Sequence, residues 1–172
     1  LTTQILEFFC NFRVILFTIM RAITIREAHH NDLEQLLEFE QEIITAERPF
    51  DATIQTNKVH YYDIEKMISA THIAVLVAQM GEEIVASGYA RIDSAAPYLN
   101  HVNYAYLGFM YTKPTHRGKG INAKIIAELK EWCSAQGITE LRLDVYNDNV
   151  AAIRAYEKVG FKKHLINMRM LP

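Results

Sequence analysis

Apolar and polar positions alternate along several short segments, and this pattern predicts strands. Residues 23–26 alternate strictly, and residues 73–80 and 84–92 are apolar runs on either side of Gly81-Glu82-Glu83, which predicts a hairpin. The aromatic segment 103–112 and the alternating segment 141–146 predict two further strands. Gly108 inside the aromatic segment indicates a bulge or a close approach of another part of the molecule.

Between these segments the apolar positions recur at helical spacing. The first helix is predicted to start after Asn31 or Asp32, either of which can cap it, and to end where Glu47-Arg48-Pro49 begins. The helices predicted in this way cover residues 33–46, 63–70, 121–136 and 150–159. After the last of them, residues 162–170 leave room for one final strand.

Length and composition favour one compact domain. The chain has 172 residues, and 50% of them are hydrophobic, which is enough for one core. We predict a single functional domain over residues 21–172. Residues 1–20 are predicted to be an extension outside it, because this apolar stretch is not long enough to span a membrane and Glu7 and Arg13 interrupt it. A helix lying on a membrane surface is the alternative for this segment, and no membrane span is expected.

The net charge and the spacing of cysteine and histidine residues argue against nucleic-acid binding and against a metal site. A net charge of −2 and a pI near 6.4 give no electrostatic basis for binding nucleic acid. Cys10 and Cys133 are far apart and form no disulfide framework or zinc spacing, so a reducing, cytoplasmic location is expected. The pair His29-His30 has no further ligands at metal-binding spacing, and no metal site is expected.

The turn between the strand ending at Thr112 and the helix starting at Ile121 is basic and rich in glycine. Arg117, Lys119 and the unpaired N–H groups of the first helical turn favour a phosphate ligand. A P-loop is excluded, because neither Ser nor Thr follows Gly118-Lys119. Gly118, Gly120 and Ala123 match the dinucleotide pattern Gly-x-Gly-x-x-Ala, but five residues, 113–117, separate it from its strand. A loop that binds the pyrophosphate of coenzyme A is the third interpretation.

Two motifs resemble the GNAT family of acyl-CoA-dependent N-acetyltransferases. Residues 117–122 resemble the family signature Arg/Gln-x-x-Gly-x-Gly/Ala, with Asn122 in place of the usual small residue. Further along, the chain matches the pattern Asn-x-x-Ala-x-x-x-Tyr-x-Lys-x-Gly-Phe at Asn149, Ala152, Tyr156, Lys158, Gly160 and Phe161. The resemblance covers about residues 21–170.

The resemblance implies a fold and a reaction. The fold is α+β, with a mixed, mostly antiparallel twisted sheet, helices on both faces, and a splay between the strands 103–112 and 141–146. The reaction is transfer of an acetyl group from acetyl-CoA, the co-substrate, to a primary amine by direct attack. The coenzyme-binding residues implied are Phe109, Met110, Tyr111, Thr112, Arg117, Gly118, Lys119, Gly120, Ile121, Asn122 and Asn149.

The resemblance also implies roles in proton transfer and acceptor binding. Tyr156 is the predicted general acid that protonates the departing thiolate, and Asp144 is a candidate base, with an ordered water as the alternative. His101, Tyr104 and Tyr106 are further candidates for the proton path. Acceptor contacts are predicted at Arg48, Phe50, Asp51, Tyr61 and Tyr62.

The acceptor itself stays open at this point. A small amine, a protein N-terminus and a lysine side chain all fit, and a homodimer is a family expectation. Two other functions are kept as alternatives: a non-catalytic acetyl-CoA sensor and a dinucleotide-binding domain.

Overall fold

The computed structural model describes residues 22–170, so the predicted extension over residues 1–20 lies outside the described part. Five strands form one sheet in the order β1 (Ile23–Glu27), β2 (Ile73–Met80), β3 (Glu83–Ser94), β4 (Asn103–Thr112) and β5 (Leu141–Arg142). The first four are antiparallel to their neighbours, and β5 is parallel to β4. The predicted fold class is therefore confirmed, and the antiparallel neighbours exclude the dinucleotide-binding alternative, which requires a parallel sheet.

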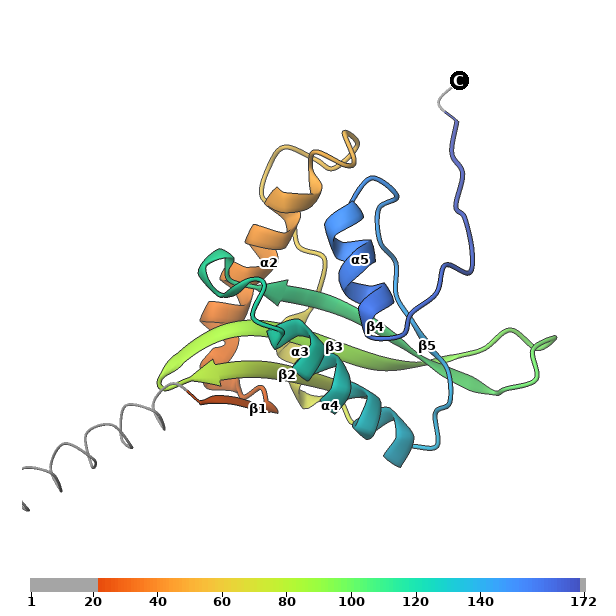
Figure 1. Cartoon of the computed structure of the whole chain (residues 1–172), viewed down its shortest axis with the longest axis horizontal. Coiled ribbons are helices and arrows are strands. Elements are labelled where there is room, and N and C mark those ends of the chain that lie inside the picture. Colours follow the sequence, from red (N-terminus) through yellow and green to blue (C-terminus); the bar gives the residue numbers. More distant parts are fainter. Residues whose placement is uncertain (1–21, 171–172) are drawn as a thin grey trace, which may run out of the picture.

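Helices cover both faces of the sheet, as predicted (Figure 1). On one face, α4 (Ile121–Ala135) buries Ile121, Ile125 and Leu129 against the strands, and α5 (Val150–Lys158) adds partly buried side chains to the same core. On the other face lie α2 (Leu33–Glu47) and α3 (Ile64–Ser69). Two short 3₁₀ turns, His30–Asp32 and Pro114–His116, precede α2 and the loop that leads to α4.

A bulge in β4 changes the face of the sheet on which the side chains of this strand pack. Ser87 on β3 pairs with Tyr111 and Tyr89 pairs with Gly108, so two residues of β4 oppose one residue of β3. Phe109, inside the bulge, has a φ of 55°, in the left-handed region. As a result Leu107 packs on the α4 side, whereas Phe109 and Tyr111 pack on the α2 side.

Gly108 is needed beside the bulge because another side chain approaches its backbone. A Cβ at this position would lie 2.6 Å from the hydroxyl oxygen of Tyr89, whose side chain is 2% exposed. The predicted bulge and the predicted close approach are both confirmed. The residue with positive φ, however, is Phe109 and not the glycine.

The sheet splays between β4 and β5. The two strands pair only at Ala105–Leu141 and Tyr106–Arg142, and residues 143–146 leave the ladder (Figure 1). The strand predicted over residues 141–146 is therefore shorter than expected. Beyond Tyr106, no strand within residues 22–170 pairs with the edge of β4 that faces β5. This opening is the splay that the resemblance implies.

Asp32 does not cap α2 with its side chain, contrary to the prediction. It occupies the N-cap position, but its carboxylate accepts two hydrogen bonds from the Arg26 guanidinium, at 2.7 and 2.9 Å, and one from the backbone N–H of His29. The Asp32 side chain is nearly buried, and a bidentate guanidinium compensates a buried carboxylate better than one helical N–H group does.

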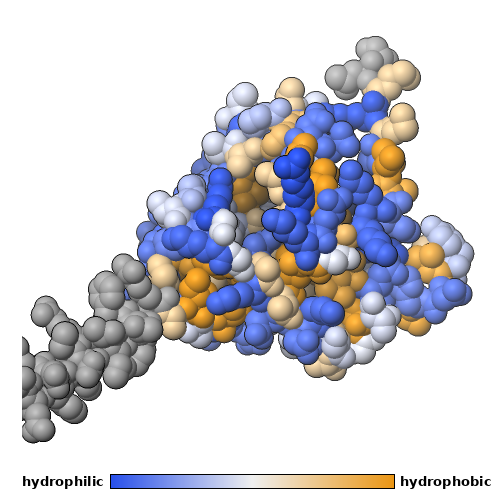
Figure 2. All heavy atoms as spheres, viewed as in Figure 1, coloured by the Kyte–Doolittle hydropathy of each residue, from blue (hydrophilic) through white to orange (hydrophobic). Residues whose placement is uncertain are grey.

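The final strand predicted over residues 162–170 is wrong, because this segment has no regular secondary structure. Four of its apolar side chains are more than 80% exposed: Leu165, Ile166, Met168 and Met170. Figure 2 shows orange atoms among blue ones toward the C-terminal end of the described chain. Arg169 nevertheless anchors the segment, because its guanidinium binds the Asp51 carboxylate at 2.9 and 3.0 Å. Within residues 22–170, no helix has the length and apolar character needed to cross a membrane.

Candidate active site

The glycine-rich turn forms an open cradle at the start of α4. Gly118 and Gly120 have φ values of 74° and 75°, and Gly120 is the N-cap residue. A Cβ at either glycine would meet no atom within 4 Å, so glycine is required by the backbone and not by crowding. Arg117 donates from Nε to the carbonyl of Thr112 at 3.1 Å, which holds the turn to the end of β4. The exposed N–H groups of such a turn and of the first helical turn suit a pyrophosphate.

Asn122, the departure from the family signature, buries the oxygen of its side-chain amide. This oxygen, Oδ1, has no hydrogen-bond partner within the described part of the chain, while the residue as a whole is only partly buried. A buried acceptor without a partner is uncommon in proteins, and this one lies at the position where the signature has a small residue.

The bulge of β4 lies at the splay. Ser87 donates from its hydroxyl to the Phe109 carbonyl at 3.1 Å, and both groups are buried. This contact fixes the left-handed residue from the β3 side. On the opposite edge, no strand among the described residues pairs with residues 107–112, so the N–H and C=O groups that point to this edge and have no side-chain partner are available to the amides of a ligand.

Tyr156 and Asn149 are both on the helix that flanks the splay, α5. The Tyr156 ring lies edge-on to Phe161, with centroids 6.0 Å apart, and packs against the α4 core. Burial, with a smaller contribution from the negative charge of Glu47, raises the pKa of Tyr156 to about 12. Its hydroxyl therefore keeps its proton at neutral pH. Asn149 caps α5, because its side-chain oxygen accepts from the N–H of Ala152 at 3.2 Å.

Asp144, the candidate base, lies where the splay begins. Its carboxylate is exposed and accepts the hydroxyl of Tyr106 on β4 at 3.1 Å. Burial, together with the charge of Asp144, raises the pKa of Tyr106 well above its usual value. The other two proposed members of a proton path, His101 and Tyr104, contact Arg142 instead: its guanidinium lies 4.2 Å above the Tyr104 ring and 3.5 Å from the His101 ring nitrogen.

The predicted acceptor residues divide into two groups. Arg48 and Asp51 brace the loop after α2: Arg48 donates to the carbonyls of Gln55 and Asn57, and Asp51 binds Arg169. The aromatic residues are closer to the sheet. Phe50 stacks on Tyr146 with centroids 5.9 Å apart, Tyr61 lies edge-on to Tyr62, and the Tyr62 ring lies 5.4 Å from that of Phe109 in the bulge. The tyrosine pair thus reaches the bulge of β4.

A buried carboxylate that we did not predict positions this tyrosine pair. Glu40 on α2 is fully buried and accepts from the backbone N–H groups of Tyr61 and Tyr62, at 2.6 and 2.8 Å. Its second oxygen lies 2.6 Å from Nδ1 of His60. The sequence does carry a signal for this residue, because Glu40 falls among the apolar positions of an amphipathic helix.

A second carboxylate that we did not predict faces several tyrosines. Glu47, the last residue of α2, lies beside the Tyr61 hydroxyl. Its charge also contributes to the raised pKa values of Tyr62, Tyr146 and Tyr156. Burial raises the pKa of Glu47 itself, and the Tyr61 hydroxyl offsets part of that effect. In Figure 2, a recess with apolar atoms in its walls opens between α2 and α5, the two helices that carry Glu47 and Tyr156.

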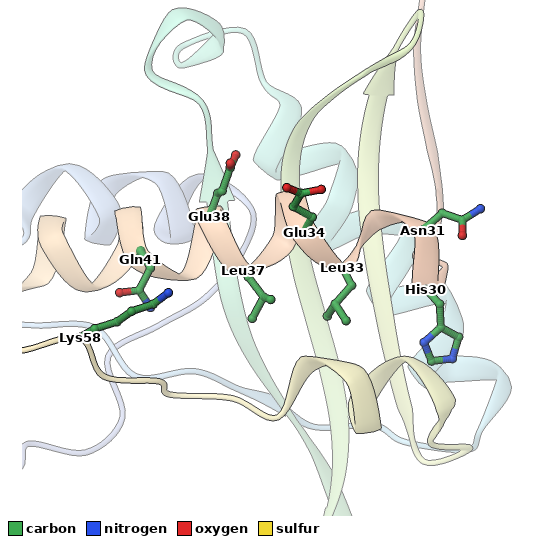
Figure 3. Close-up of a pocket in the computed structure, with 8 residues that line it drawn as sticks. All are labelled: His30, Asn31, Leu33, Glu34, Leu37, Glu38, Gln41 and Lys58. Carbon is green, nitrogen blue, oxygen red and sulfur yellow. The ribbon is translucent and has the colours of Figure 1, made fainter.

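A separate shallow hollow lies on the outer side of α2 and is lined by His30, Asn31, Leu33, Glu34, Leu37, Glu38, Gln41 and Lys58 (Figure 3). It contains none of the predicted site residues and is open to solvent, so we do not assign the reaction to it. Within residues 22–170, no group of His, Cys, Asp and Glu side chains is arranged to hold a metal ion.

Comparison with known proteins agrees with this geometry. The profile of the acetyltransferase (GNAT) family matches residues 33–161. An acetyltransferase from Sodalis glossinidius is 30% identical over 141 residues, which are 80% of this chain and 86% of that protein. An aminoglycoside N(6')-acetyltransferase from Salmonella typhimurium is 24% identical over 107 residues, which are 60% of this chain and 72% of that protein.

A solved structure has the same fold. It comes from Clostridium acetobutylicum, is described as a predicted acetyltransferase with acetyl-CoA, and matches with a TM-score of 0.67 and 21% identity over 87% of this chain and 96% of that one. Since the family profile covers most of the sequence, the two motifs and the splayed sheet have one explanation. The chain belongs to the GNAT family of acetyltransferases, and its activity is acetyl-CoA-dependent transfer of an acetyl group to an amine.

Proposed function

We propose that the acetyl group passes directly from acetyl-CoA to a primary amine at the β4–β5 splay, with Tyr156 as the general acid. One observation supports this proposal: Tyr156 packs against the core cluster to which Ala105 and Leu107 of β4 contribute, on the strand whose pairing with β5 ends at Tyr106. The glycine turn at residues 117–122 would bind the pyrophosphate, and the edge of β4 at residues 109–112 would bind the amides of the pantetheine arm.

The reaction requires a neutral amine and stabilisation of two developing negative charges. The amine nitrogen attacks the thioester carbonyl, the carbonyl oxygen becomes an oxyanion, and the carbon–sulfur bond then breaks. Backbone N–H groups at residues 109–111 would stabilise the oxyanion. Tyr156 would donate its proton to the sulfur, and a phenol suits this step because it is protonated at neutral pH and releases its proton to a stronger base.

Asn149 contributes less directly than the resemblance implies. Its side-chain oxygen is occupied as the cap of α5, so we assign it the role of fixing the start of the helix that carries Tyr156. Asp144 is a candidate base on the β5 side, where it accepts from Tyr106. The aromatic residues Phe50, Tyr61 and Tyr62 are proposed to contact the acceptor.

The acceptor is proposed to be a small amine or the amino group of a protein. Relatives include enzymes named for aminoglycosides and for thialysine, which are chemically different primary amines, and they do not decide between these classes. A cytoplasmic location and a homodimer stay predictions, based on the cysteine content and on family expectation.

The test combines binding and turnover. We expect acetyl-CoA to bind the purified protein in calorimetric titration, with NADH and ATP as controls that do not bind. Tyr156→Phe should bind acetyl-CoA as the wild type does but release free thiol at least about 100-fold more slowly with an accepted amine, the lower range of a general acid's contribution. Wild-type turnover of this variant across pH would remove Tyr156 from its role.

The same experiment separates the enzyme from a sensor. A non-catalytic sensor would bind acetyl-CoA and release no thiol with any amine. Absence of acetyl-CoA binding would instead refute the assignment of the 117–122 turn to the coenzyme.

A further inference from the structure

Glu47 lies between α5 and the loop of residues 48–62, which carries the predicted acceptor residues and is called the acceptor loop below. It ends α2, and its backbone carbonyl accepts from the N–H groups of Phe50 and Asp51, at 2.8 and 3.2 Å, so the turn that follows holds its backbone in place. Its side chain is partly buried. Few carboxylates in a protein are placed away from water without a partner charge, and those that are often have a function.

The charge of this carboxylate acts on tyrosines from three segments. Tyr61 and Tyr62 come from the loop before α3, Tyr146 from the segment after β5, and Tyr156 from α5. The charged groups near them are Arg48, which adjoins Tyr61, and the Asp51–Arg169 pair, which adjoins Tyr146. Because Arg48 and Arg169 already contact loop carbonyls and Asp51, neither neutralises Glu47 with an ion pair among the described residues.

Glu47 lies near both the proposed acid, Tyr156, and the proposed acceptor residues. On one side it is close enough to Tyr156 for its charge to affect that hydroxyl. On the other side Tyr61 contacts Tyr62, whose ring lies against Phe109 in the bulge that would hold the oxyanion. A carboxylate placed between the acid and the acceptor loop has the location that a base for the incoming amine requires.

The other carboxylates near the splay suit this task less well. β4 carries no Asp or Glu between residues 103 and 112. Asp144 is exposed and is already bound to Tyr106. Glu42 is bound to the Tyr111 hydroxyl, and Glu40 is fully buried with both oxygens occupied.

We propose that Glu47 is the general base that removes a proton from the acceptor ammonium, and that its carboxylate and the nearby tyrosines select a cationic primary amine. This inference rests on the proposed acetyl transfer and names its base and the charge of its acceptor. Rings of tyrosine attract cations over their faces, so they add to the selection made by the carboxylate. The raised pKa of Glu47 supports the role, because it brings the carboxylate closer to neutral pH than a free side chain would be.

The protons balance over the cycle. The ammonium gives one proton to Glu47, directly or through a water, and the neutral nitrogen attacks the thioester carbon. As the carbon–sulfur bond breaks, Tyr156 gives one proton to the departing sulfur, and the second proton of the nitrogen restores the Tyr156 phenol, directly or through a water. Glu47 passes the first proton to solvent, so the products are the acetamide, free coenzyme A and one proton.

The experiment compares three variants of the full chain: Glu47→Gln, Asp144→Asn and Glu38→Gln. Glu38 is the matched control, because it is an exposed carboxylate on the same helix and lines the outer hollow in Figure 3. Thiol release is measured against pH with spermidine, lysine, glucosamine and kanamycin, and the fastest amine is used for all variants. Calorimetry with acetyl-CoA and thermal unfolding show whether each variant is folded and binds the coenzyme.

We expect Glu47→Gln to bind acetyl-CoA normally and to lose about 100-fold or more in kcat/KM at neutral pH, the range of a general base. The loss should shrink as the pH approaches the pKa of the free amine, because the amine then needs no base. A merely structural role would lower activity equally at every pH. Wild-type kcat/KM and pH profile in Glu47→Gln would overturn the proposal, as would a large pH-dependent loss in Asp144→Asn alone.

The same measurements distinguish failure of the proposed acetyl transfer from failure of the role of Glu47. If the wild type releases no thiol with any of the four amines, the proposed function fails and the role of Glu47 falls with it. If the wild type is active, Tyr156→Phe is slow and Glu47→Gln is normal, only the role of Glu47 fails.

Discussion

Replacing Glu40 with alanine tests how the acceptor loop is held in place. The Glu40 carboxylate is fully buried and accepts from the N–H groups of Tyr61 and Tyr62, while His60 contacts its second oxygen. Glu40→Ala removes the acceptor and leaves the two backbone donors facing an apolar space. We therefore expect the tyrosine pair to lose its fixed position, although neither tyrosine is changed.

The magnitude follows from the number of groups left without a partner. Each unsatisfied buried N–H costs about 1–3 kcal/mol, so two of them cost about 2–6 kcal/mol. Water entering the space left by the side chain, and relief from keeping a charge buried, reduce this cost. We expect a net loss of about 2–4 kcal/mol in the free energy of unfolding, which a domain of this size survives.

Two further variants make the measurement specific. Glu40→Gln keeps one oxygen for the two N–H groups and places an amide NH₂ against His60, which can accept from it as the neutral tautomer. Its loss should stay below about 1 kcal/mol, within the ordinary worth of one hydrogen bond. Glu34→Ala, an exposed position on the same helix, should change stability by less than about 0.5 kcal/mol.

The assay is urea unfolding followed by circular dichroism, combined with steady-state kinetics on an accepted amine. Glu40→Ala should raise the KM for the amine and leave acetyl-CoA binding unchanged, because the loop that Glu40 holds is on the acceptor side. An alanine variant as stable as Glu34→Ala, with a wild-type KM, would refute the claim that this carboxylate positions Tyr61 and Tyr62.

Three further predictions concern the turn, the bulge and the buried tyrosines. Gly120→Asp should abolish acetyl-CoA binding in calorimetry, because it puts a side chain at a φ of 75° and a negative charge beside the pyrophosphate; unchanged affinity would contradict the assignment of the turn. Gly108→Ala should destabilise the fold by about 1–3 kcal/mol in urea unfolding, since the new Cβ would lie 2.6 Å from the buried Tyr89 hydroxyl. Burial raises the pKa of Tyr62 and of Tyr106, so the unfolded chain releases these protons first, and stability should fall as the pH rises above about 10. A free energy of unfolding that does not change between about pH 9 and pH 11 would contradict this last prediction.

Much of the fold could be predicted because its causes are local. Alternation identified the hairpin, Gly81 marked its turn, and the helical period started where Gly120 ends the basic turn. The glycine-rich turn between β4 and α4 was predictable for the same reason, because consecutive residues encode it, and its binding of phosphate stays a prediction.

The features that the sequence did not reveal depend on contacts between residues that are far apart in the sequence. The change of face at Phe109 is a property of the pairing between β3 and β4, and alternation within β4 alone predicts the wrong face for Phe109 and Tyr111. The segment 162–170 has a strand-like pattern, but no neighbour pairs with it. Asp32 was predicted as a cap because Arg26 was not known to lie beside it.

The two unpredicted carboxylates have the same explanation. Glu40 is meaningful only because residues 60–62 fold back onto it, and Glu47 only because Tyr61 and Tyr156 approach it from other segments. The proposed base lies at the end of a helix, at no fixed distance in sequence from the proposed acid Tyr156. No sequence motif therefore contains both residues. Asp144 was the better guess from sequence because it lies on a strand next to the second motif.

The two-pair contact between β4 and β5 also has a consequence for how the protein opens. Among the described residues, strand pairing joins residues 141–170 to the rest of the sheet only at Ala105–Leu141 and Tyr106–Arg142, and side-chain packing and the Arg169–Asp51 pair supply the other contacts. The amide protons of this segment should therefore exchange with solvent through partial openings that leave β1 to β4 intact. Tyr156 belongs to this less stable unit, whereas the pyrophosphate turn belongs to the more stable one. A coenzyme bound to both units would stabilise the closed state. Each tenfold increase in coenzyme concentration above its dissociation constant would then slow the amide exchange of residues 141–170 by about tenfold.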